Sequence, residues 1–114
     1  MIALVWEFEV AAGKSTDFER FYGADGEWTE LSRRSRSFLG SSFLRDIAAE
    51  NRYVLVEYWG EMVVYERHVV DFGDRVKALE RRRDQFVIRV QPMGVFTALD
   101  VPPRVGPTWS RRSK

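Results

Sequence analysis

The stretch "VEYWGEMVVYERH", residues 56–68, marks the point where a strand ends and a helix begins. A run rich in β-forming residues ends at Trp59. A stripe of apolar residues spaced three and four apart begins at Met62. Trp59, Tyr65 and the only histidine of the chain, His68, lie within ten positions of one another. The stretch therefore predicts a strand that leads directly into a helix, with an aromatic corner between them.

Strand patterns lie on both sides of this junction. Apolar residues alternate in residues 2–10, which predicts a half-buried strand with Glu7 and Glu9 on its polar face. Further strands are predicted at about 38–46, 52–59 and 87–99. Pro92 lies inside the last of these and cannot donate a ladder hydrogen bond. We therefore expect a bulge or an edge position there.

Two helical regions separate these strands. Thr16 and Glu19 have the spacing of a capping box and predict the start of the first helix. Two glycines interrupt that helix, which is expected to resume from Asp25 or Gly26. The second stripe runs from Met62 towards Phe86, and Gly73 inside it predicts a break or a kink. The resulting order, β-α-β-β-α-β, predicts an α+β, ferredoxin-like fold with an antiparallel sheet.

Composition excludes several classes of protein. Basic and acidic residues number 18 and 17, so the net charge of +1 argues against a dedicated nucleic-acid or membrane-surface protein. There is no cysteine, which excludes disulfides, thiolate metal sites and cysteine nucleophiles. One histidine does not suffice for a histidine-rich metal site within a chain. The sequence also contains no glycine-rich phosphate loop, so we expect no metal or organic cofactor.

The two ends of the sequence differ in character. The alternating start has no basic region or cleavage site typical of a signal peptide. No apolar run approaches the length of about 20 residues needed to cross a bilayer, so we expect a cytoplasmic protein. Residues 1–99 form the predicted domain. Residues 100–114 are rich in proline and basic residues and predict an extended C-terminal arm.

The arrangement "FYGADGEW", "FLGSSFLRD", "RYVLVEYW" and "YERH" resembles the antibiotic biosynthesis monooxygenase-like proteins of the dimeric α+β barrel superfamily. The matching features are Gly40 before the second strand, "LRD" at 44–46, Trp59 at a strand end and Tyr65 six residues later. The resemblance covers residues 2–99. It implies a homodimer, and oxygenation of aromatic, polyketide-like or quinol substrates without a cofactor.

The resemblance also implies roles for single residues. A tryptophan and a tyrosine at the spacing of Trp59 and Tyr65 line the substrate pocket in the quinone-forming relatives. Tyr65 would then donate a hydrogen bond to a substrate oxygen, and Trp59 would form an apolar wall. The alternative is that both side chains simply pack in the core at a strand-to-helix corner.

Four further residues are candidates. His68 is one helical turn beyond Tyr65 and is a candidate general base, or alternatively a half-solvated boundary residue. Glu57 shares a strand face with Trp59, where its carboxylate would bind substrate or Tyr65, or else pair with a helix arginine. Trp28 and Tyr22 flank the break in the first helix and would form either a pocket lid or ordinary core.

Two other functions can be tested against the sequence: haem degradation, and binding of an anion or nucleic acid by the arginine-rich run at 80–86. Haem-degrading relatives carry a strand asparagine, a helix tryptophan and a histidine ten residues later. Here Asn51 lies in a loop, and the other two positions hold His68 and Ala78, so we do not expect haem degradation. The arginine-rich run at 80–86 also contains acidic residues and predicts a solvated helix face.

Two functions remain compatible with the sequence. The first is a cofactor-independent monooxygenase, with Tyr65, His68 and Glu57 as catalytic residues and Trp59, Trp28 and Tyr22 around the substrate. The second is a non-catalytic dimeric protein that binds small molecules or acts as an accessory protein. In either case we expect a homodimer that binds neither nucleic acid nor membrane.

Overall fold

Each predicted strand and helical region is present in the computed structural model, which describes residues 1–100. The predicted arm therefore lies outside the described residues, apart from Asp100. Both helical regions are split, so the order is β-α-α-β-β-α-α-β. The elements are β1 (Ile2–Val10), α1 (Ser15–Tyr22), α2 (Glu27–Ser32), β2 (Phe38–Arg45), β3 (Arg52–Trp59), α3 (Met62–Asp71), α4 (Gly73–Arg83) and β4 (Val87–Thr97).

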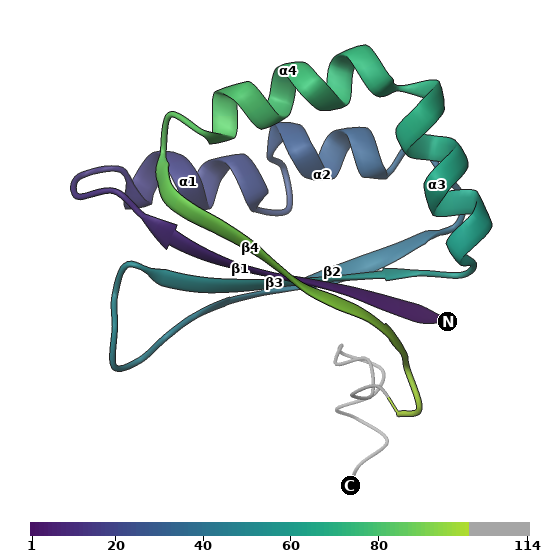
Figure 1. The fold of residues 1–114 in the computed structure, drawn as a ribbon, viewed down its shortest axis with the longest axis horizontal. Coiled ribbons are helices and arrows are strands. Elements are labelled where there is room, and N and C mark those ends of the chain that lie inside the picture. Colours follow the sequence, from purple (N-terminus) through teal and green to yellow (C-terminus); the bar gives the residue numbers. More distant parts are fainter. Residues whose placement is uncertain (101–114) are drawn as a thin grey trace, which may run out of the picture.

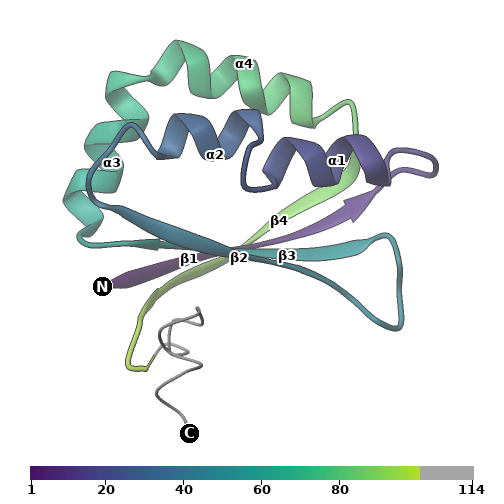
Figure 2. The same cartoon turned by 180° about the vertical axis from the view of Figure 1, so that it is seen from behind.

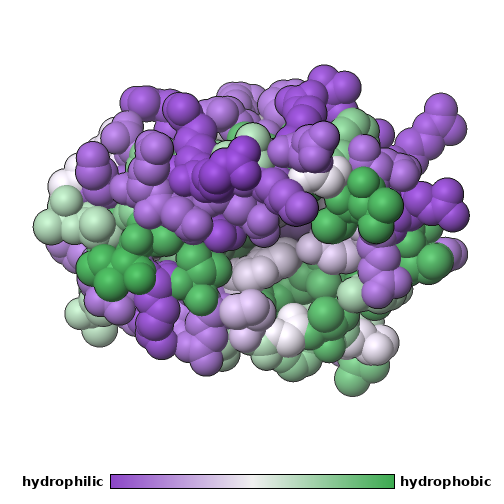
Figure 3. Space-filling model, turned by 45° about the horizontal axis from the view of Figure 1, so that its top comes forward, coloured by the Kyte–Doolittle hydropathy of each residue, from purple (hydrophilic) through white to green (hydrophobic). Residues whose placement is uncertain are grey.

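The four strands form one antiparallel sheet in the order β2-β3-β1-β4. All four helices lie on the same side of this sheet, and α3 lies at one end of it, at an angle to α4 (Figures 1 and 2). This is the ferredoxin-like α+β arrangement predicted from the order of elements. The outward surface of the helical layer is mainly hydrophilic (Figure 3). In residues 1–100, no helix is both long enough and apolar enough to span a membrane.

The core between sheet and helices is largely aromatic. Phe8 of β1 packs against Phe18 and Tyr22 of α1, with ring centroids 5.1 and 5.0 Å apart. Tyr53 of β3 lies 4.9 Å from Phe18 on the same layer. Burying each such ring contributes about 1.5–3 kcal/mol, and the ring contacts add further stability. The alternation of β1 and β3 therefore fixes the helix-covered face, here called the inner face.

The helix boundaries confirm one sequence prediction and correct another. Gly73 is the first residue of α4, so the predicted break is confirmed. The predicted capping box is wrong, because α1 already begins at Ser15 and its N-terminus has no side-chain cap. Glu19 instead accepts a hydrogen bond from the Tyr53 hydroxyl at 2.5 Å. Its carboxylate thus ties α1 to β3 rather than capping its own helix.

The break between α1 and α2 needs glycine at Gly26. A Cβ atom there would lie 2.2 Å from the carbonyl oxygen of Phe21, far inside any allowed contact. The chain can therefore turn tightly after α1 and begin α2 at Glu27. The turn places Trp28 over the sheet, close to the rings of Tyr22 and Phe21.

β4 is an edge strand with a bulge, as Pro92 predicted. The pairing with β1 shifts register between Val5 and Trp6, which face Gly94 and Pro92 respectively, so Met93 has no partner. Gly94 has a positive φ of 137°, which favours glycine over other residues. The strand ends at Thr97, two residues before the predicted end.

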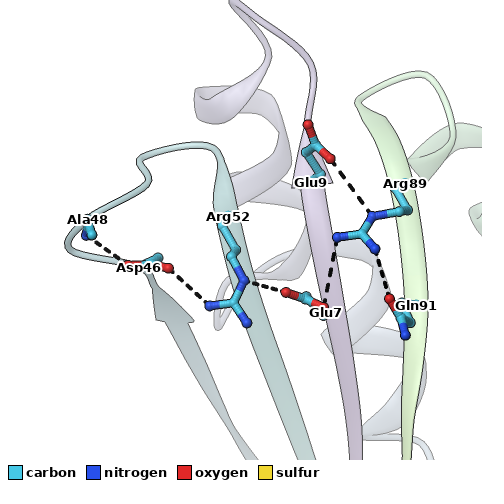
Figure 4. Close-up of polar contacts among 7 residues, drawn as sticks. All are labelled: Glu7, Glu9, Asp46, Ala48, Arg52, Arg89 and Gln91. Atoms are coloured by element: carbon cyan, nitrogen blue, oxygen red, sulfur yellow. Dashed lines mark hydrogen bonds and ion pairs between the residues drawn. The ribbon is translucent and has the colours of Figure 1, made fainter.

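The face of the sheet away from the helices, here called the outer face, has an apolar half and a charged half. Val5, Val56 and Phe96 lie on the apolar half, where Phe96 is exposed. Leu44, also exposed, lies in the same row as Glu7, at the border of the two halves. On the charged half, Arg52 pairs with Glu7 and Asp46, and Arg89 lies 4.0 Å from Glu7 (Figure 4). These charges largely neutralise one another across β3, β1 and β4.

Candidate functional site

The least expected feature of the inner face is the way Glu57 is held. Its side chain is 2% exposed and points from β3 towards the helices. One carboxylate oxygen accepts a hydrogen bond from Nε1 of Trp28 at 2.6 Å, and the other accepts one from Nε1 of Trp59 at 3.0 Å. A single carboxylate therefore links α2 to the end of β3.

No arginine or lysine forms an ion pair with Glu57 among the described residues. The predicted alternative, a pair with a helix arginine, is therefore wrong. Burial raises the pKa of Glu57, and the two indole donors only partly oppose that shift. A buried carboxylate with neutral donors alone is costly to fold, which marks it as a candidate functional group.

One side of Glu57 is tightly packed. Trp59 is fully buried, and its ring lies 5.1 Å from Tyr65 and 5.2 Å from His68. His68 in turn lies 5.0 Å from the ring of Phe72. At 7% exposure His68 is buried, so the prediction of a half-solvated boundary residue is wrong. Burial lowers the pKa of His68, against the charge of Asp71, and favours the neutral imidazole.

A small cavity lies nearby, beside Trp28. It has a volume of about 80 Å³ and lies between the inner face and the helices, and we call it the Tyr65 hollow. It is lined by Trp6, Tyr22, Trp28, Leu55, Tyr65, Glu80 and Arg83. Three of the six predicted site residues thus line one cavity, namely Tyr22, Trp28 and Tyr65. Glu57 lies behind Trp28, whereas Trp59 and His68 belong to the packed side.

Two polar residues of the hollow, Glu80 and Arg83, were not predicted as site residues. Both lie in the arginine-rich run for which the sequence predicted a solvated helix face, and for these two that prediction is wrong. The Arg83 side chain is only 14% exposed and forms an ion pair with Asp84 at 3.0 Å. The signal was available in their spacing, because Val76, Glu80 and Arg83 follow one another at intervals of four and three on one face of α4.

The two tyrosines of the hollow are hydrogen-bond donors at neutral pH. Burial raises the pKa of Tyr65 to about 12, and the charges of Glu57 and Glu80 add to the shift. Burial raises the pKa of Tyr22 further still, although the neighbouring Arg83 guanidinium opposes it. Both hydroxyls therefore stay protonated. With Arg83 they supply hydrogen-bond donors and positive charge to a cavity whose other lining residues are Trp6, Trp28, Leu55 and the acidic Glu80.

A larger groove lies outside this layer. It has a volume of about 310 Å³ and is bounded by α1, the start of α2 and the end of α4. An ion pair of 2.7 Å between Arg82 and Glu27 belongs to its wall. It contains none of the predicted site residues. Within residues 1–100, no cluster of three His, Asp or Glu side chains is placed to hold a metal ion.

Comparison with known proteins finds similar folds among solved structures. No protein-family model matches the sequence, and no curated protein does either. Solved structures do match. SnoaB, a cofactor-independent oxygenase from Streptomyces nogalater, superposes with a TM-score of 0.68 at 22% identity, covering 90% of this chain and 97% of that one.

Two further structures agree with this match. A candidate antibiotic biosynthesis monooxygenase from Bordetella bronchiseptica has a TM-score of 0.67 at 23% identity, covering 86% of this chain and 96% of that one. A candidate antibiotic biosynthesis monooxygenase from Nitrosomonas europaea has a TM-score of 0.69 at 14% identity, covering 86% of this chain and 89% of that one. This chain has the antibiotic biosynthesis monooxygenase-like fold. The resemblance in "RYVLVEYW" and "YERH" is thereby confirmed for the fold, whereas chemistry depends on the site itself.

Proposed function

We propose that this protein is a cofactor-independent monooxygenase of phenolic or quinol substrates, which bind at the Tyr65 hollow. The single observation that carries the proposal is the composition of that cavity. Aromatic rings line it together with the protonated Tyr65 hydroxyl, the Arg83 guanidinium and the Glu80 side chain. Such a site favours a planar aromatic molecule with an oxygen that binds Tyr65 and Arg83 and points away from the Glu80 carboxyl group.

The chemistry needs little from the protein beyond this environment. A deprotonated phenol is electron-rich enough to react with dioxygen, and the protein has to bind it, stabilise its oxyanion and exclude water. Tyr65 and Arg83 would bind the oxyanion. Glu57 would accept the phenolic proton once Trp28, which separates it from the hollow, moves aside. In the monooxygenation of an anthrone, the keto form of such a phenol, the ring CH₂ and O₂ give a ring C=O and water, so no external reductant is required. His68 lies outside the hollow, and the proposal assigns it no contact with substrate.

Two further points support the proposal from outside the cavity. The fold is shared with SnoaB, whose own description is a cofactor-independent oxygenase. The chain has no cysteine and a single histidine, and it lacks the haem-degrading triad. We therefore expect turnover to persist after dialysis against a chelator, and hemin to give no stoichiometric shift of its Soret band when mixed with the protein.

The test is oxygen uptake during aerobic incubation with a panel of anthrones and hydroquinones. Uptake above the spontaneous rate, with one water formed per anthrone oxidised, supports the monooxygenase. Saturable binding of the same compounds without uptake would instead support the non-catalytic binding protein. The absence of both binding and oxygen uptake for every compound of the panel would contradict the proposal.

We also propose that the protein is a homodimer that pairs through the outer face. The apolar half of that face carries Val5, Val56 and Phe96, with Leu44 at its border, and has no cover among the described residues. A second copy would cover it and protect the sheet edges. Sedimentation equilibrium at micromolar concentration tests this, with Val56→Glu expected to yield monomers. A monomeric wild-type protein would contradict it.

A further inference from the structure

The Tyr65 hollow is too small for the ligand class that its lining favours. Its volume is about 80 Å³, which is room for two or three water molecules. An engineered cavity that binds benzene measures about 150 Å³, and natural ligand sites about 300–1,000 Å³. An aromatic ligand can therefore enter only if a side chain of the wall moves away.

Among the residues that line the hollow, Trp28 is the one whose displacement would expose the carboxylate of Glu57. Tyr22 and Leu55 are buried in the core, whereas Trp28 is only partly buried. It comes from α2, a helix of six residues. Its indole covers Glu57 and donates to it at 2.6 Å. Because Gly26 is packed against the carbonyl of Phe21, rotation of the side chain is easier than movement of the backbone.

We propose that, without ligand, the indole of Trp28 occupies the position in which the ligand's aromatic ring binds. The ligand then displaces the indole and forms the hydrogen bond to Glu57 in its place. This proposal rests on the function proposed above and specifies the substrate class. The replacing molecule must be planar and aromatic, as the indole is. It must also donate one hydrogen bond to Glu57, since otherwise the buried carboxylate loses a partner. A second oxygen on the molecule would reach Tyr65 and Arg83.

The second donor of Glu57 supports this division of roles. Trp59 is fully buried and lies in contact with Tyr65, His68 and Phe38. Its indole therefore holds one carboxylate oxygen in place while the other changes partner. An exchange of Trp28 N–H for a ligand O–H keeps the number of hydrogen bonds to Glu57 constant. The ligand class is thus a phenol with a second oxygen on the ring system, such as a dihydroxy- or hydroxy-keto-aromatic.

Calorimetric titration with 2-naphthol and with 2-methoxynaphthalene, which has the ring but no O–H donor, tests the proposal. Trp28→Ala should bind 2-naphthol more tightly than wild type by about tenfold, because no indole has to be displaced. It should also prefer 2-naphthol over the methyl ether by about tenfold or more, the usual range for a hydrogen bond to a charged group. In the double variant Trp28→Ala, Glu57→Gln, this preference should shrink.

Trp6→Ala is the matched control. Trp6 lines the same hollow, and no hydrogen bond joins it to Glu57. Its removal adds volume but leaves Glu57 covered, so both naphthalenes should gain affinity equally. Should Trp28→Ala fail to fold, Trp28→Phe serves the same purpose. A phenyl ring donates no hydrogen bond to Glu57, so a ligand displaces it more easily than the indole.

The outcomes separate this inference from the proposed function. Unchanged or weaker binding of 2-naphthol by Trp28→Ala, with binding by wild type, would overturn the inference and leave the proposed function standing. Equal gains for both naphthalenes in Trp28→Ala would remove the role of Glu57 and overturn it too. Absence of binding in wild type and in every variant would overturn the proposed function and this inference with it.

Discussion

Two carboxylates on neighbouring strands are held in opposite ways. Glu7 of β1 lies on the outer face, where its partners are the cationic side chains of Arg52 and Arg89. Glu57 of β3 lies on the inner face, where its partners are two neutral indoles. The Glu7 side chain is 12% exposed and Glu57 is 2% exposed, so the less solvated carboxylate is the one without a cation.

The difference indicates that the two carboxylates have different roles: the ion pairs of Glu7 stabilise the fold, whereas Glu57 is a candidate functional group. Around Glu7, Asp46 and Glu9 complete a network of charges that are satisfied by one another (Figure 4). Its effect is to fix the 47–51 hairpin loop and β4 relative to β1. Around Glu57, desolvation is opposed only by two indole hydrogen bonds, and burial raises the pKa of the carboxyl group. The pattern is that of a site held ready for chemistry.

The largest effect should come from Tyr65→Phe on turnover. The phenyl ring keeps its contact with Trp59, and only the hydroxyl that faces the hollow is lost. We expect turnover of an active phenol to fall by about 10²–10⁴-fold, the usual contribution of one positioned acid or base. Urea denaturation should show little change in stability. Parental turnover in Tyr65→Phe would mean that this corner is packing alone.

The two donors of Glu57 should differ in stability. Trp59→Ala empties a fully buried site and should lower the free energy of unfolding by about 3–5 kcal/mol. Trp28→Ala removes a partly exposed ring and should cost clearly less. Urea denaturation of the two variants side by side measures this. Equal losses would show that Trp28 is as much a core residue as Trp59, which weakens its assignment as a displaceable wall.

These expectations depend on side-chain detail that the sequence predicted only in part. Periodicity in residues 2–10 and in the stripe from Met62 was enough for the fold, because β1 and the helices each bury one regular face. The position of Pro92 predicted the bulge because a missing N–H has a fixed consequence. Local sequence chemistry of this kind is short-range and can be recognised without knowing the tertiary structure.

The partners of Glu57 follow from tertiary packing instead. Trp28 is 29 residues away from it, so the bond depends on how the α1–α2 break places α2 over the sheet. Arg83 likewise looked like one of several surface arginines, and only the packing of α4 on Tyr22 brings it to the hollow. His68 was predicted as a general base or, alternatively, as a half-solvated boundary residue, whereas its ring is buried against Trp59 and Phe72.

The next effect is the pH dependence that Glu57 imposes on stability. Its pKa is raised in the folded state above the ordinary value of 4.5, so the native protein binds its proton more tightly than the unfolded chain does. Stability is therefore highest below the unfolded pKa and falls as pH rises through the folded pKa. Glu57→Gln should remove this part of the slope in urea denaturation above pH 4.5. An identical slope in wild type and Glu57→Gln would contradict the shift.

The smallest effect should come from Glu7→Gln, the outer-face counterpart. Glu7 pairs with arginines that are largely exposed, so at low salt we expect the unfolding equilibrium constant to change by less than about tenfold. Glu9→Gln, with a single contact of 3.8 Å to Arg89, is the control and should change it less. The measurement is urea denaturation of wild type and both variants in low and in about 1 M salt.

The salt dependence of Glu7→Gln decides whether water reaches the charged half of the outer face. At about 1 M salt the screening length is only about 3 Å, so the difference between wild type and Glu7→Gln should vanish if the network is solvated. If instead the proposed dimer also covers this half, the charges are desolvated and the difference should persist, together with a loss of dimer. A large effect that is insensitive to salt would thus make Glu7 resemble Glu57, and would remove the contrast between a solvated structural network and a buried functional carboxylate.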